Sequence, residues 1–128
     1  MLDHISIGVS DLEASKSFYL KALVSLGVGV VKAAPGSVGL GRLGFPAFWL
    51  SATDRAPAPL HLAFRAENRE QVDAFYRAAL EAGARDNGVP GLRAHYHPDY
   101  YGAFVIGPDG HNVEVVCHHA PAAAQSGR

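Results

Sequence analysis

The sequence predicts an α+β fold built from two paired βαβββ modules, each with a helix packed on one face of a mixed β-sheet. The first observation is an internal repeat, because residues 4–23 and 61–80, offset by 57 positions, share six identities in twenty. The second is that each copy places a short alternating run before a helical pattern and three strand-like runs after it. A single helix and a small sheet cannot cover their own apolar faces, so the two modules are expected to pair. The identities are His4/His61, Glu13/Glu70, Phe18/Phe75, Tyr19/Tyr76, Ala22/Ala79 and Leu23/Leu80.

The first module is predicted to span about residues 1–55. A strand at 4–9 precedes a helix near 11–23, and Ser10 followed by Glu13 three residues later indicates a capping box at the start of that helix. Strand-like runs follow at about 28–33, 38–43 and 47–52. Pro35 and Gly36 mark the turn between the first two of these runs.

The second module is predicted to span about residues 59–119, after a proline-rich link at 56–59. Its strand at 61–66 leads to a helix capped by Asn68 with Gln71 at N3, and Gly83 suits the position after the helix end. Further strand-like runs lie at about 84–88, 102–107 and 112–118, with a turn at 108–110. We expect residues 1–119 to form one domain and residues 120–128 to form a flexible tail.

The composition is that of an ordinary globular chain. The 128 residues are 48% hydrophobic and 18% charged, with 11 Lys and Arg against 12 Asp and Glu. Scattered basic residues argue against nucleic acid, and no apolar run is long enough to cross a membrane. The single cysteine, Cys117, excludes an intramolecular disulfide, and without a secretory leader pattern we expect a cytoplasmic protein.

Alternation along the strands places three ligand-type side chains on one face of the sheets. In the strands at 4–9 and 61–66, His4 and His61 are out of phase with the apolar positions, so both imidazoles project from the face without helices. Glu114 takes the same face in the last strand. Two imidazoles and a carboxylate suit one divalent metal ion with positions left for substrate, and Zn, Fe, Mn and Ni all accept these donors.

Three segments resemble the vicinal oxygen chelate superfamily, which includes glyoxalase I, extradiol dioxygenases, fosfomycin-resistance enzymes and bleomycin-resistance proteins. They are LDHISIGVSDLEASKSFY near the start, PLHLAFRAENREQVDAFY in the middle and AFVIGPDGHNVEVV near the end. The resemblance implies that the paired modules curl into a cup with helices outside, and that His4, His61 and Glu114 hold the metal. It also implies a homodimer, in which modules pair either within one chain or across chains.

The sequence departs from glyoxalase I at the fourth ligand position that this superfamily often uses. The strand PAFWLSA offers Trp49 or Ser51 there, and neither side chain is a usual ligand. A three-ligand site is closer to the dioxygenase and thiol-transferase branches, so the resemblance implies a metal-dependent lyase, dioxygenase or transferase. The alternative is a binding protein of the bleomycin-resistance kind, which sequesters a small molecule without chemistry.

The segment HYHPDYY at 95–101 is rich in hydrogen-bonding rings, and the sequence allows either a loop over the cup or an ordered surface loop with its Tyr rings packed at the base. Its Tyr101, next to the following strand, is our first choice for a catalytic group beside Glu114. Trp49 is expected to form an apolar wall, and Arg65 to meet an anionic substrate or a structural carboxylate. The predicted substrate-binding residues are therefore Trp49, Arg65, His95, His97, Tyr100 and Tyr101.

Overall fold

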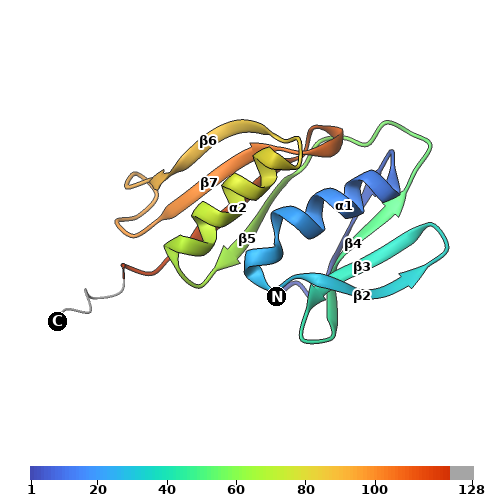
Figure 1. Cartoon of the computed structure of the whole chain (residues 1–128), viewed down its shortest axis with the longest axis horizontal. Coiled ribbons are helices and arrows are strands. Elements are labelled where there is room, and N and C mark those ends of the chain that lie inside the picture. The colour runs from blue at the N-terminus through green and yellow to red at the C-terminus, as the bar shows by residue number, and fades with distance from the viewer. Residues whose placement is uncertain (122–128) are drawn as a thin grey trace.

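The computed structural model describes residues 1–121, and it contains two four-stranded sheets, each covered by one helix (Figure 1). The predicted tail at 120–128 lies, from residue 122 onward, outside the described residues. Within the chain the two sheets are separate, and strands β1 and β5 form an edge of each. The arrangement confirms the predicted α+β fold of two βαβββ modules.

The first module forms a sheet with strand order β1-β4-β3-β2. Strand β1 runs parallel to β4, and the β2–β3 and β3–β4 pairs are antiparallel hairpins. Gly36 adopts a left-handed φ of 77° in the first hairpin turn, which confirms the turn expected there. The elements are β1 (Ile5–Val9), α1 (Leu12–Ala22), the 3-10 turn η1 (Val24–Leu26), β2 (Gly29–Ala34), β3 (Ser37–Arg42) and β4 (Phe45–Ala52).

The second module repeats this layout with strand order β5-β8-β7-β6. Strand β5 runs parallel to β8, and the other pairs are antiparallel. Its elements are β5 (His61–Ala66), α2 (Arg69–Glu81), β6 (Arg85–Leu92), β7 (Tyr101–Ile106), the 3-10 turn η2 (Pro108–Gly110) and β8 (Asn112–Cys117).

Helix capping agrees with the prediction in the second module and corrects it in the first. The side chain of Asn68 accepts a hydrogen bond from the Gln71 backbone N–H at 2.9 Å, as predicted. In the first module the N-cap is Asp11, whose carboxylate accepts from the Ala14 N–H at 3.0 Å. Ser10, the predicted cap, instead donates its hydroxyl to Asp109 of η2 at 2.6 Å. Asp11 stands opposite Asn68 in the repeat, so a cap one residue later follows from the repeat itself.

Nearly all buried apolar side chains of both modules belong to one hydrophobic cluster. Helices α1 and α2 lie side by side and pack against each other (Figure 1). The rings of Phe48 and Phe64, from β4 and β5, meet edge to face with centroids 5.2 Å apart. The two modules are thus joined through their helix-covered faces, which leaves the opposite faces of both sheets open. No helix in residues 1–121 has the length and hydropathy of a membrane-spanning segment.

Candidate functional site

The alternation predicted for the ligand-bearing strands is present in the structure. On β5, Leu62 and Ala66 are buried among the core residues, whereas His61 and Arg65 are exposed on the other face. On β8, Val113 and Val115 enter the core, and Glu114 takes the open face. The parallel register pairs Ala63 with Glu114, which brings the His61 side chain within reach of the Glu114 carboxylate.

A pair formed by His61 and Glu114 is the centre of the candidate site. His61 Nε2 lies 2.8 Å from Glu114 Oε1, and the second oxygen, Oε2, accepts a short hydrogen bond from the Tyr100 hydroxyl. Glu114 is only 1% exposed, while the His61 side chain is 54% exposed. A buried carboxylate is stable only when its oxygens are bonded, and here both are.

Gly102 leaves the room that this arrangement needs. A Cβ at residue 102 would lie 3.3 Å from Glu114 Oε2 and 3.3 Å from the Tyr100 ring. Both contacts are tighter than ordinary van der Waals separations, so a larger residue would push the phenol away from the carboxylate.

Tyr100 stays protonated in this environment. Burial, followed by the hydrogen bond to Glu114, raises the pKa of the Tyr100 phenol well above its usual range. The group therefore acts as a donor at neutral pH and holds Oε2 in place.

The structure places Tyr101, the predicted catalytic tyrosine, on the opposite face of β7. Its hydroxyl donates to Asp73 of α2 at 2.6 Å, and the Arg69 guanidinium lies 5.0 Å from its ring centroid. Burial and the bond to Asp73 raise the pKa of Tyr101 to about 12. Tyr101 thus ties the sheet to its helix, and Tyr100 takes the position beside Glu114 that was assigned to Tyr101.

Histidines border the pair on the side of the 95–101 loop. His97 Nε2 lies 2.8 Å from His118 Nδ1, and both rings meet the Tyr100 ring edge to face. Burial, followed by the charges of Arg65 and His97, lowers the pKa of His118. His95 stands further out, against Tyr96, with ring centroids 4.2 Å apart. His118 is not among the predicted site residues, although it shares strand parity with Glu114, and this parity is the sequence signal that points to its place beside the site.

The remaining predicted ligand, His4, lies in the first module. Its Nδ1 is 2.8 Å from Asp3 Oδ1, and its side chain is 56% exposed. Nearby on the same sheet, the Ser6 and Ser51 hydroxyls are 3.2 Å apart, and the Trp49 ring lies over Gly39. Within residues 1–121 of a single chain, no three His, Cys, Asp or Glu side chains gather closely enough to hold one metal ion.

The donor atoms of His61 and Glu114 fit two adjacent positions around a metal ion. Two ligands at roughly 2.1 Å from an ion lie about 3.0 Å apart when they are at right angles and about 3.4 Å apart in a tetrahedral site. The observed separation of 2.8 Å between Nε2 and Oε1 is close to the right-angle value. The exposed imidazole keeps the position open to solvent, so an ion can replace the hydrogen shared by the two groups.

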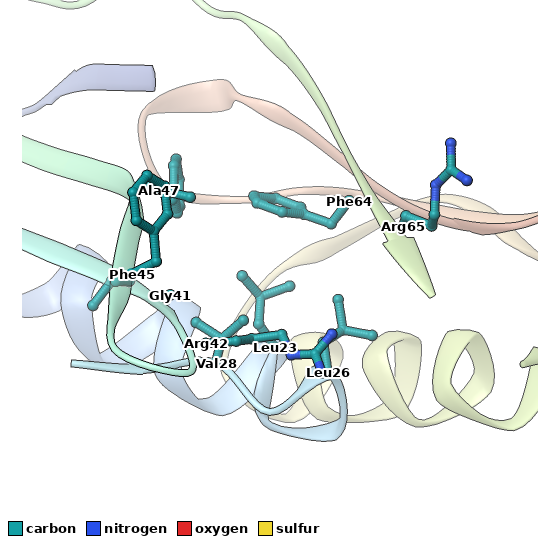
Figure 2. A pocket seen from close by; sticks show the side chains of 11 residues that line it. Leu23, Leu26, Val28, Gly41, Arg42, Phe45, Ala47, Phe64 and Arg65 are labelled. Atoms are coloured by element: carbon teal, nitrogen blue, oxygen red, sulfur yellow. The ribbon is translucent and has the colours of Figure 1, made fainter. Parts of the chain in front are cut away.

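A pocket of about 270 Å³ lies away from this pair, at the junction of the modules. It is lined mainly by apolar side chains from both modules, including Leu23 and Phe64 (Figure 2). Figure 2 shows the Arg65 guanidinium turned away from these side chains. Arg65 therefore belongs to the open face that carries His61.

The fold and the repeated modules define the class of protein, and comparison with known families gives the same result. The chain belongs to the Glyoxalase/Bleomycin resistance protein/Dioxygenase superfamily, whose family model matches residues 1–115. This confirms the resemblance drawn from the three sequence segments. No curated protein matches the chain.

Solved structures give the same fold. A glyoxalase/bleomycin resistance protein from Albidiferax ferrireducens T118 is 31% identical, with a TM-score of 0.77 over 89% of this chain and 96% of that chain. A putative glyoxalase from Bacillus halodurans is 26% identical, with a TM-score of 0.69 over 91% of this chain and 95% of that chain. A family enzyme from Burkholderia phytofirmans PsJN, 20% identical, has a TM-score of 0.72 over 92% and 98% of the two chains and is similar in fold.

Proposed function

We propose that this chain is a cytoplasmic metal-dependent enzyme of the glyoxalase/dioxygenase type that acts on a small oxygen-bearing substrate. The observation that carries the proposal is the buried Glu114 carboxylate, which faces the exposed His61 imidazole at 2.8 Å. Burying the Glu114 carboxylate costs free energy, and the pair offers one oxygen and one nitrogen to a divalent ion. Zn, Fe, Mn and Ni all suit these donors.

The third ligand in this proposal is His4 from a second copy of the chain. In a single chain His4 belongs to the other sheet, and residues 1–121 contain no three-ligand group. A homodimer that faces the first module of one subunit with the second module of its partner would complete the site with His4. The two open sheet faces would then form the cup expected of this fold.

A bound divalent ion would supply Lewis acidity to a chelating substrate oxygen. The chain's own residues would hold the ligand atoms in place around that ion. Tyr100 fixes Oε2 of Glu114 and so holds Oε1 toward His61. Tyr100 remains protonated, and the His97 and His118 rings beside it, whose Nε2 and Nδ1 atoms lie 2.8 Å apart, are the side chains that would accept or pass a proton there.

Mixed dimers test this proposal directly. His4→Ala and Glu114→Gln chains, purified together through two different histidine-free tags, should regain one intact site per dimer, while each homodimer binds no metal. In the regained site, His4 comes from the Glu114→Gln chain, and His61 and Glu114 come from the His4→Ala chain. Metal content after dialysis, measured by elemental analysis, reports the result. If the mixed dimer is as empty as the two homodimers, the ligands are not shared across chains.

A second candidate function is small-molecule binding without chemistry, as in bleomycin-resistance proteins. The observation in its favour is that residues 1–121 of one chain bring together only two of the three predicted ligands, His61 and Glu114. Wild-type protein that binds no divalent metal after anaerobic reconstitution would favour this function over the enzyme. Light scattering that finds only a monomer at micromolar concentration would contradict the shared site.

Replacing Tyr100 by phenylalanine should weaken metal binding by about 10- to 100-fold, as is usual when a partner of a ligand is lost. The reason is that Oε2 of the buried Glu114 loses its donor and the carboxylate can turn away from His61. Isothermal titration with Zn²⁺ measures the effect. Tyr101→Phe is the matched control, because its hydroxyl bonds Asp73 on the other face and its loss should leave metal affinity unchanged. Equal effects of the two variants would contradict this role of Tyr100.

A further inference from the structure

We propose that the ligand of this site is an organic anion, whose carboxylate is bound by Arg65 while its vicinal oxygens reach the His61–Glu114 pair. The inference rests on the proposed function and adds the charge of the substrate and the residue that selects it. It comes from the position of Arg65 and from the distribution of acidic residues over the eight strands.

Arg65 is placed to reach a ligand held at His61. The two residues share one face of β5, and their separation of four positions puts their Cα atoms about 13 Å apart, so a ligand held at His61 meets the long Arg65 side chain by extending along the strand. The Arg65 side chain is exposed, and Figure 2 shows its guanidinium turned away from the apolar pocket between the modules. Its charge also acts on His118, which stacks on His97 at the edge of the site.

No acidic side chain in residues 1–121 forms a salt bridge with Arg65. The sequence left open whether Arg65 meets a structural carboxylate or an anionic ligand. Asp99, an acid in the neighbouring loop, lies 3.9 Å from Arg69, and Asp3 lies 2.8 Å from His4. The described part of the chain therefore contains no carboxylate that pairs with Arg65, and its guanidinium is available to a ligand carboxylate.

The strands provide no alternative partner, even when the cup closes. The eight strands contain two acidic residues, Asp86 and Glu114, and β1–β4 contain none. Asp86 accepts from the Tyr76 hydroxyl of α2 at 3.0 Å, and Glu114 is engaged by His61 and Tyr100. Whichever modules pair, the strands of the opposing module bring no carboxylate to Arg65.

A second cation strengthens the positive potential of this face. The Arg93 guanidinium lies 5.4 Å from the Phe104 ring centroid, and that ring lies 6.1 Å from the His61 ring. Within residues 1–121 the Arg93 guanidinium donates to the Val89 carbonyl at 2.9 Å and forms no salt bridge, so no carboxylate neutralises its charge there. Two arginines beside one engaged carboxylate favour an anionic organic ligand over a neutral or cationic one.

The experiment compares two probes that share vicinal hydroxyls and size but differ in charge, 3,4-dihydroxybenzoate and 3,4-dihydroxybenzamide. We expect the wild-type protein to bind the benzoate about tenfold more tightly than the amide, since charge-assisted bonds are about twice as strong as neutral ones. Arg65→Gln should abolish this preference and leave the affinity for the amide unchanged. Arg65→Lys should restore part of it. Arg77→Gln, which removes an exposed arginine from α2, is the matched control and should behave as wild type.

Isothermal titration is run on metal-free and Zn²⁺-loaded protein, so that this inference and the proposed function can fail separately. Protein that takes up no Zn²⁺ but keeps an Arg65-dependent preference for the benzoate supports the anion site and contradicts the metal enzyme. Equal binding of benzoate and amide by wild type, or an undiminished preference in Arg65→Gln, in both states overturns the anion site.

Discussion

Replacing Glu114 by glutamine should abolish tight binding of a divalent ion. The expected loss exceeds the roughly 100-fold that removal of a ligand's outer partner costs, because an amide oxygen lacks the negative charge that the ion requires. Elemental analysis and Zn²⁺ titration of the purified variant measure this loss. Any metal-dependent turnover should fall with it.

The same variant should fold nearly normally, which separates loss of the ion from loss of structure. Glutamine has the size of glutamate and can still accept from Tyr100 while meeting His61 across 2.8 Å. Glu81→Gln, at an exposed position of α2, is the matched control and should retain full metal affinity. A Glu114→Gln protein that holds Zn²⁺ as tightly as wild type would show that the carboxylate is no ligand.

Strand alternation and the internal repeat predicted the fold and the central pair of the site. His61 and Glu114 could be assigned to one face because apolar residues on both sides of them fix the phase of β5 and β8. The same rule applied to β7 would have placed Tyr101 with Ala103 and Val105 on the core face. The phase of β7 therefore indicates Tyr100, and not Tyr101, for the open face that carries Glu114. The prediction of Tyr101 rested only on its position next to the strand.

The location of His4 relative to His61 could not be predicted in this way. Alternation assigns each imidazole to a face of its own sheet, but it carries no information on how two sheets lie relative to each other. That relation depends on the packing of α1 against α2 and on the aromatic contact between Phe48 and Phe64. These contacts join residues of different modules, and their geometry is not encoded in a short sequence pattern. The mixed-dimer experiment therefore tests whether the two modules that form one cup belong to one chain or to two.

Replacing Phe75 by alanine should cost about 3–5 kcal/mol of unfolding free energy, the usual range for a buried phenylalanine. Phe75 is 0% exposed and lies on α2, which contacts β5, β6, β7 and β8 as well as α1 and η1 of the first module. The cavity would therefore open where both modules meet, in a protein whose total stability is expected to be about 5–15 kcal/mol.

Urea unfolding followed by circular dichroism measures this change, and Leu80→Ala is the matched control. Leu80 lies on the same helix but is 36% exposed, so its truncation should cost less than about 1 kcal/mol. A single unfolding transition that moves as a whole in Phe75→Ala would show that the modules unfold together. Two separate transitions, with only one of them shifted, would contradict this expectation. They would mean that the contact between α1 and α2 does not couple the unfolding of the two modules.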